Sequence, residues 1–231
     1  MRMVVIADIH GNLGALQRIM DSVSWKKDDV IICPGDFTDM SAVPQNFDQS
    51  DVADMAIQKL LIPHLPLFCV PGNHDPYEIV DLFSEYRTNL HNRKEKKGTI
   101  TFVGWGGAAT PFNTNFEPTE EETLTSLSAL TENIGGLWVL VVHAPPKGTS
   151  LDVIGGGTHV GSSSIRKTIE EKKPSLVISA HVHENSGTDT IGKSVVFYPG
   201  PAYSGFYGIV EMKNGKPSCT THRVPVRSDG S

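Results

Sequence analysis

The sequence predicts an α/β protein built on mixed β-sheets, and three observations lead to that fold class. Apolar runs typical of strands alternate with helix-like segments through the first 180 residues. Beyond residue 186 the pattern changes to consecutive strand-like runs. Strands separated by helices can pair in parallel, whereas consecutive strands pair as antiparallel hairpins, so both kinds of pairing are expected. Finally, polar residues follow the early strands, and strand ends are where open α/β sheets place their functional sites.

The expected strands fall into two groups. Five apolar runs in the helix-containing part are predicted to be strands: residues 3–7, 30–33, 67–70, 137–142 and 176–180. The later group comprises residues 188–191, 195–198, 206–213 and 218–224. Asn214-Gly215 lies between the last two runs, and this dipeptide strongly favours a tight hairpin turn.

Five segments between the early strands carry helix signals. The first, residues 13–23, has its apolar residues on one face and Asn12 as the expected N-cap. Thr119 and Glu122 have the spacing of a capping box and begin a helix that runs to about residue 131. The other expected helices cover residues 51–62, 76–83, with Pro76 in the first turn, and 162–171.

Length and composition indicate one globular domain. A chain of 231 residues can bury a sizeable core, and its hydrophobic (39%) and charged (20%) fractions are ordinary. We expect a single domain over residues 1–225 and a disordered tail at 226–231. Asp8 comes too early for a cleaved leader, and no apolar run is long enough to span a bilayer. Cys33 and Cys69 suit buried thiols rather than disulfides, so a reducing cytoplasm is the expected compartment.

The chain is acidic, which bears on its partners. It has 20 Lys and Arg against 26 Asp and Glu, a net charge of −6. Because a large nucleic-acid footprint needs a basic face, this balance argues against one. The basic stretch at residues 93–97 is expected to be a solvated turn between strands rather than a phosphate-binding patch.

Five polar blocks follow the five early strands in order. They are Asp8-Ile9-His10, Gly35-Asp36, Gly72-Asn73-His74-Asp75, His143 and His181-Val182-His183. Their side chains supply enough oxygen and imidazole ligands for two adjacent divalent cations, with one His left over. Asp36 can offer one carboxylate oxygen to each cation and so reduce the repulsion between them. The full series at strand ends favours a two-metal site over scattered surface residues.

The charge and ligand types of such a site restrict its contents. Two divalent cations outweigh Asp8, Asp36 and a bridging hydroxide by about one unit of charge, so the pocket would attract a phosphate. Imidazole and carboxylate ligands without thiolate suit Mn, Fe, Co, Ni or Zn better than Ca or Mg. Zinc-finger and deaminase sites are excluded because the chain lacks paired Cys ligands.

The blocks resemble those of the calcineurin-like metallophosphoesterase superfamily from residue 3 to about residue 200. His143-Ala-Pro-Pro and the stretch from Leu151-Asp152 through His159-Val-Gly-Ser look like those of its small prokaryotic phosphodiesterase-type members. The resemblance implies a four-layer αββα sandwich with two mixed sheets and a dimetal site at the strand ends. It also implies the division of the ligands. One metal takes Asp8, His10, Asp36 and His183, and the other takes Asp36, Asn73, His143 and His181.

Two departures from the family pattern stand out. Ala180 precedes His181, where the family usually has Gly. The block that begins at Gly35-Asp36 lacks the Arg-Gly that follows the second Asp in Ser/Thr protein phosphatases, which argues against that branch.

The resemblance further implies in-line attack on phosphorus by a hydroxide that bridges the two metals. His74, the His not needed as a ligand, is assigned to protonating the leaving oxygen or to stabilising the transition state, and Asp75 to orienting its imidazole. The expected substrates are phosphodiesters, such as cyclic nucleotides or small nucleotide-like conjugates. The superfamily includes monomers and dimers, so a homodimer stays open.

Three further residues are weaker candidates for contacts around the metals or the substrate. Asp39 is either a hydrogen-bond acceptor for a ligand His or a solvated loop carboxylate, and Glu184 beside His183 presents the same choice. His159 could be carried toward the substrate by the loop at residues 155–159, or that loop could be a plain connector.

Two other functions compete with hydrolysis by a dimetal phosphoesterase. A catalytically silent scaffold for protein interaction would keep this fold, but here His74 and all seven candidate ligands are present. A nuclease of the same superfamily would need a basic surface, which the acidic balance disfavours.

Overall fold

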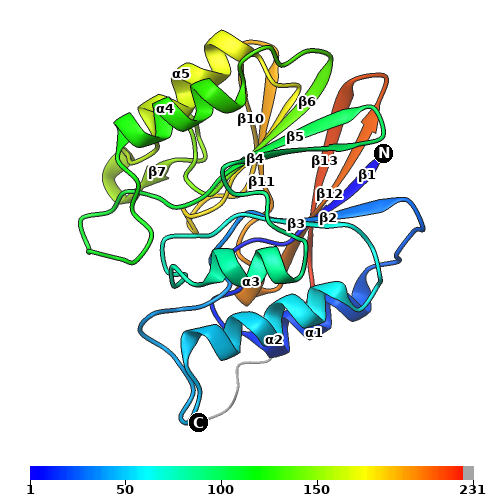
Figure 1. The fold of residues 1–231 in the computed structure, drawn as a ribbon, viewed down its shortest axis with the longest axis vertical. Helices are drawn as coiled ribbons and strands as arrows, with labels where there is room; N and C mark the ends of the chain where they lie inside the picture. The colour runs from blue at the N-terminus through cyan, green and yellow to red at the C-terminus, as the bar shows by residue number, and fades with distance from the viewer. Residues whose placement is uncertain (226–231) are drawn as a thin grey trace.

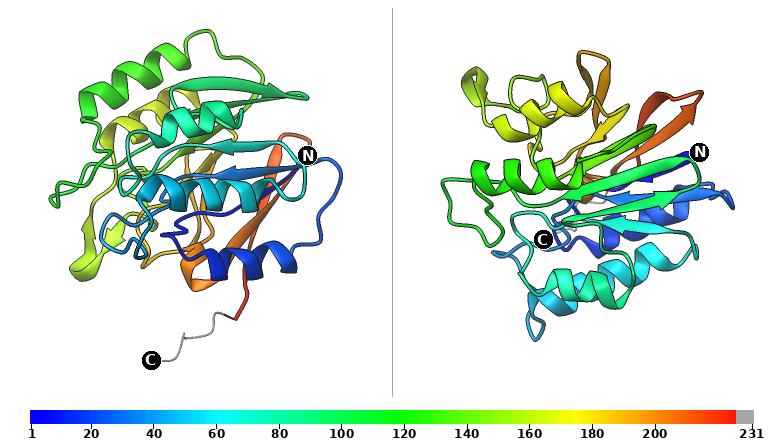
Figure 2. Two further views of the ribbon diagram at one scale, coloured as in Figure 1. Left: turned by 60° about the horizontal axis from the view of Figure 1, so that its bottom comes forward. Right: turned by 45° about the horizontal axis from the view of Figure 1, so that its top comes forward.

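Two β-sheets stack face to face, and helices cover the outer side of each sheet (Figure 1). The computed structural model describes residues 1–225, and the tail expected at residues 226–231 lies outside the described residues. Figure 2 shows from two further directions that one pair of helices lies above the sheets and the remaining helices lie below them. The expected four-layer αββα arrangement with two mixed sheets is confirmed.

The first sheet has the strand order β13-β12-β1-β2-β3. Its members are β1 (Arg2–Val5), β2 (Asp29–Cys33), β3 (Leu67–Cys69), β12 (Phe206–Lys213) and β13 (Lys216–Arg223). The first three strands are parallel, whereas β12 runs antiparallel to both β1 and β13. Lys213 and Lys216 are paired across Asn214-Gly215, which confirms the hairpin turn.

The second sheet has the order β10-β11-β9-β6-β5-β4. Its members are β4 (Arg93–Lys97), β5 (Ile100–Trp105), β6 (Leu137–Val142), β9 (Leu176–Ile178), β10 (Gly187–Ile191) and β11 (Ser194–Tyr198). The four central strands are parallel, and the two edge strands are antiparallel to their neighbours. A separate small hairpin joins β7 (Val153–Ile154) to β8 (Thr158–His159) through the 3-10 turn η1 (Gly155–Gly157).

Local signals set where the helices begin. The helices are α1 (Leu13–Ser22), α2 (Gln49–Leu61), α3 (Ile79–Glu85), α4 (Glu120–Leu130) and α5 (Ser163–Lys172). Oδ1 of Asn12 accepts a hydrogen bond of 2.9 Å from the Ala15 amide, as expected of an N-cap. Thr119 and Glu122 form the expected capping box at the start of α4. None of these helices has the length and apolar character needed to cross a lipid bilayer.

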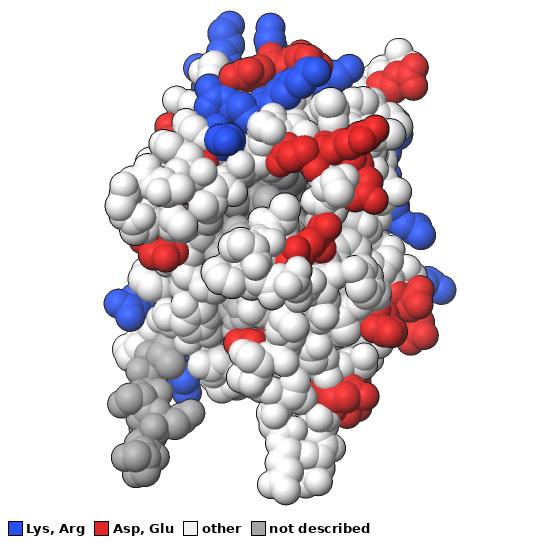
Figure 3. Space-filling model, turned by 90° about the vertical axis from the view of Figure 1, so that its left-hand side faces the viewer, with Lys and Arg blue, Asp and Glu red and all other residues white. Residues whose placement is uncertain are grey.

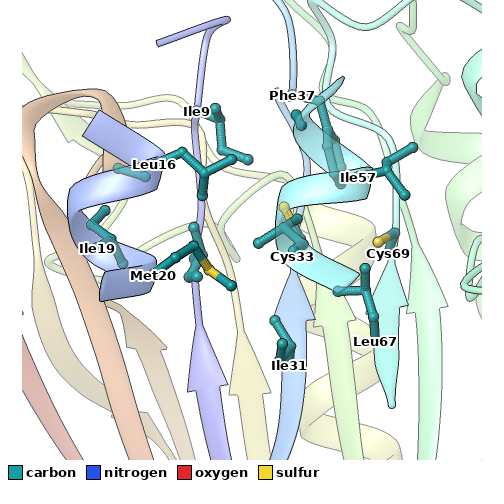
Figure 4. Close-up of a cluster of buried hydrophobic side chains, with 14 of the residues drawn as sticks. Ile9, Leu16, Ile19, Met20, Ile31, Cys33, Phe37, Ile57, Leu67 and Cys69 are labelled. Carbon is teal, nitrogen blue, oxygen red and sulfur yellow. The ribbon is translucent and has the colours of Figure 1, made fainter. Parts of the chain in front are cut away.

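Alternate residues of the strands point to different apolar layers. In β1, Val4 packs in the layer beneath α1 and α2, whereas Met3 and Val5 pack between the two sheets. Figure 4 shows the first of these layers, in which Leu16 and Ile19 of α1 lie on one side and Ile57 of α2 lies near Cys33 and Cys69 on the other. Since both faces of the central strands are buried, their sequences are almost continuously apolar. Helices α4 and α5 cover the outer face of the second sheet in the same way.

One expectation about the fold was wrong. Residues 93–97 form the fully exposed edge strand β4 rather than a turn, and they pair with β5. The charged residues are solvated as expected, but an antiparallel edge strand can present such side chains to water and still bond its backbone to one neighbour. The apolar run that became β5 was not among the expected strands.

Candidate metal centre

The seven candidate ligands all lie in loops that follow parallel strands, at one edge of the molecule. Those from the first sheet follow β1, β2 and β3: Asp8, His10, Asp36 and Asn73. Those from the second sheet follow β6 and β9: His143, His181 and His183. Because the carboxyl ends of parallel strands point the same way, segments far apart in the sequence meet at this edge.

Four of these residues form a first group whose ligand atoms lie within 4.8 Å of one another: Asp8, His10, Asp36 and His183. Nε2 of His10 lies 3.3 Å from Oδ2 of Asp36 and 3.2 Å from Nε2 of His183. Nε2 of His183 is 3.6 Å from Oδ1 of Asp8. Two imidazole nitrogens and two carboxylates therefore face a common point from different directions.

Asp36 also belongs to a second group, with His143 and His181. Nε2 of His143 lies 3.4 Å from Oδ2 of Asp36 and 3.0 Å from the amide oxygen of Asn73. Nδ1 of His143 is 2.8 Å from the carbonyl oxygen of Pro34, which can only accept a hydrogen bond. When this imidazole is neutral, its proton therefore resides on Nδ1, and Nε2 can offer its lone pair to a cation bound beside Asp36.

The chemistry of this donor set fits bound cations. Oδ2 of Asp8 and Oδ2 of Asp36 are buried, and neither has a hydrogen-bond partner within the described residues. A buried carboxylate oxygen that accepts no hydrogen bond is costly, because it has lost water, and at Asp36 only the imidazoles of His10 and His143, 3.3 Å and 3.4 Å away, offset that loss. Divalent cations at the two groups would satisfy both oxygens.

The loop backbone is held in an uncommon conformation around the same residues. Asp8, His10, Asp36 and His181 all have positive φ angles, between 45° and 78°. Asp and His tolerate this left-handed region better than most residues, but it still costs free energy, and such strain concentrates at functional sites. Position 35 requires glycine, because a Cβ atom there would lie 2.6 Å from Nδ1 of His143.

Opposite charges stabilise each other across the second group. Burial opposes ionisation of Asp36, but the imidazoles of His143 and His10 hold its pKa well below the ordinary value. Burial likewise opposes protonation of His143, yet Asp36 raises its pKa to about 9. His181 differs, because burial and the neighbouring His143 lower its pKa to about 4. A cation at this position would replace the proton on His143 as the partner of Asp36.

His74 lies beside the two groups, but its expected partner is a different residue. Asp75 does not orient its imidazole. Oδ1 of Asp75 accepts hydrogen bonds from the amide and hydroxyl of Thr38, and Oδ2 accepts one from the Gly72 amide. The carboxylate beside the His74 ring is that of Asp39, with Oδ1 3.6 Å from Nδ1. Asp75 points inward, and through these hydrogen bonds it joins the loop after β2 to the loop after β3.

Two of the weaker candidates, Asp39 and His159, lie in different places. Asp39 lies at the site, and its Oδ2 is 3.8 Å from Nδ1 of the ligand candidate His10. His159 instead faces Asp152, with Nδ1 2.7 Å from Oδ1 of that residue. Asp152 also accepts hydrogen bonds from the amides of Thr149 and Gly161, so this pair holds the β7–β8 hairpin to its neighbouring loop.

Glu184 and Ala180 flank the His-x-His block. The side chain of Glu184 is exposed and makes no hydrogen bond to a ligand candidate within residues 1–225. Ala180 is fully buried and its φ angle is not positive, so its methyl group is accommodated in the apolar layer under α4 and α5. The left-handed residue of this turn is His181.

A cleft of about 410 Å³ opens onto the first group, lined by His10, Asn12, Asp39, His74, His183 and Tyr203. Figure 3 shows the molecule from the side to which the strand ends point. Charged side chains are sparse near the middle of this face, and Lys and Arg gather at its upper end. Tyr203 was not anticipated from the sequence. It belongs to the 3-10 turn η2 (Ala202–Ser204) that follows β11. Its place shortly after the end of a strand is the one sequence feature that could have indicated a position at the site.

A second hollow of about 540 Å³ lies behind the loop that precedes α4. Aromatic and acidic side chains line it, including Tyr77, Trp105, Phe116 and Glu121. The Trp105 side chain is mostly buried against this hollow and the second core, whereas Phe112 is 79% exposed and has no core role. No candidate ligand lines this hollow.

Known proteins resemble this chain in sequence and in fold. Residues 1–185 match the sequence pattern of the calcineurin-like phosphoesterase family. The uncharacterized protein MJ1162 of Methanocaldococcus jannaschii is 35% identical over 208 residues, which cover 87% of this chain and 88% of that protein.

Two solved structures resemble the fold. TT1561 of Thermus thermophilus has a TM-score of 0.70 at 18% identity, over 95% of this chain and 97% of that one. A dimetal phosphatase from Danio rerio has a TM-score of 0.67 at 11% identity, over 96% of each chain. At these identities the likeness is one of fold alone.

Proposed function

Because the chain belongs to the calcineurin-like phosphoesterase family, we propose that it is a metal-dependent phosphoester hydrolase with two divalent cations in its active site. The observation that supports this most directly is the pair of ligand groups that share Asp36. The buried Oδ2 atoms of Asp8 and Asp36 accept no hydrogen bond within the described residues, so a cation at each group would give them a partner.

The proposed ligands divide between two positions. Asp8, His10 and His183 would hold one cation, and Asn73, His143 and His181 would hold the other, with Asp36 bound to both. When bound, the cations would supply a hydroxide nucleophile at neutral pH and stabilise the charge of the phosphoryl group. Mn, Fe, Co, Ni and Zn all suit these nitrogen and oxygen ligands.

His74 is the proposed proton donor to the leaving oxygen. Its ring is 29% exposed in the cleft, whereas its Nδ1 is buried and faces Asp39. Nε2 is therefore the nitrogen that a substrate can reach. The carboxylate of Asp39 faces Nδ1 and can hold the ring with Nε2 toward the leaving oxygen, which is the placement that a general acid needs. Asp39 thus takes the positioning role that the sequence suggested for Asp75.

The charge of the cleft supports phosphodiesters as the substrate class. No Lys or Arg among residues 1–225 lines it, and Asp39 adds a negative charge beyond those of the ligands. A diester carries one negative charge, whereas a monoester carries close to two at neutral pH. A cleft without basic side chains to offset its carboxylates repels a diester less than it repels a monoester. We therefore propose cyclic nucleotides or small nucleotide-like diesters as substrates.

A metal-by-substrate matrix tests this function. Bis-p-nitrophenyl phosphate, p-nitrophenyl phosphate and cyclic nucleotides are each assayed with Mn, Fe, Co, Ni or Zn, after removal of metal with a chelator. We expect metal-dependent turnover with the diester preferred. The absence of hydrolysis with every metal would contradict the proposal, and a monoester preference would contradict its diester part alone.

The variant His74→Ala adds a test of the proton donor. We expect it to keep both metals and to lose on the order of 100-fold in kcat. His222→Ala is a matched control, because His222 stacks on Tyr207 away from the cleft. If His74→Ala kept full activity with its metals in place, another group would have to protonate the leaving oxygen.

A further inference from the structure

Tyr203 is fixed in the cleft by the same loop that supplies Asp8 and His10. Its amide donates a hydrogen bond of 3.1 Å to the carbonyl oxygen of Asp8, and its carbonyl oxygen accepts one of 3.1 Å from Nδ2 of Asn12. Its ring stands edge-on to the rings of His10 and His183, with centroids 5.5 Å and 5.2 Å away. The phenol group is therefore held in place before any substrate arrives.

The hydroxyl group of Tyr203 lies within hydrogen-bond distance of Nδ1 of His183, at 3.3 Å. The other ring nitrogen of His183, Nε2, faces Asp8 and His10 in the first ligand group. A neutral imidazole that offers the lone pair of Nε2 to a cation carries its proton on Nδ1. Nδ1 is then the donor, and the oxygen of Tyr203 is the acceptor.

This assignment leaves the hydroxyl proton of Tyr203 uncommitted and inside the cleft. The other lining side chains have tasks already. His10 and His183 are proposed ligands, His74 is the proposed acid, and Asp39 can only accept hydrogen bonds. Asn12 uses its amide to cap α1 and to hold the backbone of Tyr203. Since no Lys or Arg of the described chain lines the cleft, Tyr203 is the side chain best placed to donate to an anion there.

We propose that Tyr203 binds a non-bridging oxygen of the substrate phosphate through its hydroxyl proton, while His183 orients that hydroxyl group from behind. This inference rests on the proposed function, because the anion is taken to be the phosphate group of the substrate. Tyr203 is then a substrate-binding residue that connects a metal ligand to the phosphate, and its hydroxyl group adds a hydrogen-bond donor for the anion.

Binding of inorganic phosphate to the Mn-saturated protein tests the proposal without needing turnover. Isothermal titration calorimetry compares the wild type with Tyr203→Phe, which keeps the ring and its edge-on contacts and loses only the hydroxyl group. We expect phosphate affinity to fall roughly 10- to 100-fold, the usual effect of losing one hydrogen bond to a charged acceptor. The Mn affinity of both proteins is measured first, so that phosphate is titrated at full metal occupancy.

Tyr86→Phe is the matched control, because its hydroxyl group also bonds to a side chain, Oδ1 of Asp54, but lies outside the cleft. This variant should bind phosphate like the wild type. Equal phosphate affinity in the wild type and Tyr203→Phe would overturn the proposal, even if Mn affinity fell, because Tyr203 would then only support His183. A wild type that binds phosphate but hydrolyses no ester would count against the proposed function and leave the role of Tyr203 measurable.

Discussion

Oδ1 of Asp39 lies 3.6 Å from Nδ1 of His74, at the edge of the cleft. Asp39 is held in this place by its own loop, because the same oxygen accepts hydrogen bonds from the amide and hydroxyl of Ser41. Burial opposes ionisation of Asp39 slightly, but these bonds and the nearby imidazoles lower its pKa, so the carboxylate is charged at neutral pH. A fixed negative charge therefore faces the buried nitrogen of the proposed acid.

Asp39→Asn should lower kcat by roughly 10- to 100-fold, the range found when a group that orients an active-site imidazole is lost. The amide keeps an oxygen for the bonds from Ser41 but removes the carboxylate that faces Nδ1 of His74. Metal content should stay at the wild-type level, because Asp39 is not among the proposed ligands. Steady-state kinetics and metal analysis by mass spectrometry check both parts, and wild-type kcat would contradict the prediction.

Asp36→Asn should reduce metal affinity by on the order of 100-fold or more, because Asp36 is shared by both ligand groups and its charge is needed between two cations. Calorimetric titration with Mn of the metal-free protein measures this. Asp21→Asn, at an exposed position on α1, is the control and should bind Mn like the wild type. Equal affinity in the two variants would mean that Asp36 does not bridge the metals.

Metal removal should lower the thermal stability. The unpartnered oxygens of Asp8 and Asp36 cost free energy in the metal-free fold, and a ligand present at 100 times its Kd adds about 2.7 kcal/mol. For a chain of this size that corresponds to a Tm increase of roughly 5–10 °C. Differential scanning calorimetry with and without Mn checks it. Asp36→Asn should lack most of the shift, and a wild type with the same Tm in both conditions would argue against a preformed site.

The free energy of unfolding should fall in acid because His91 is buried. Burial lowers its pKa to about 4 from 6.5. As the pH falls from 6.5 to 4, the unfolded chain gains a proton that the folded chain does not, so stability is lost over this window, by up to about 3 kcal/mol. His91→Gln keeps an acceptor for the Gly106 amide and does not titrate. Urea denaturation should show that the stability of the wild type relative to His91→Gln falls by up to about 3 kcal/mol between pH 7 and pH 4, and a constant difference would be the contrary result.

Local features of the fold were predictable from the sequence, and pairing between distant segments was not. The cap at Asn12, the capping box at Thr119 and the turn at Asn214 each depend on neighbouring residues, and each was confirmed. The strand β4 was missed because its charged residues resemble a loop, and its edge position depends on β5. Which strands share a sheet is set by packing between segments far apart, which periodicity does not encode.

The same distinction holds for the candidate site. The residues expected as ligands were found through their order after strands, and the structure brings them together at one edge. Asp75 was paired with His74 because the two are adjacent in sequence, yet adjacent side chains in this turn point in different directions. Tyr203 lies in no motif, and its approach to His183 depends on the connection between β11 and β12.

The proposed ligands come from both sheets, and this has a consequence for how the molecule holds together. Asp8, Asp36 and Asn73 precede the middle of the chain, whereas His143, His181 and His183 follow it. Cations shared between them would act as a cross-link between the two halves of the polypeptide, much as a disulfide does when it closes a long loop. Away from this edge, apolar packing holds the two sheets together. Substitutions among the ligands would thus weaken the architecture and the chemistry together, whereas changes at the far ends of the strands would affect the architecture alone.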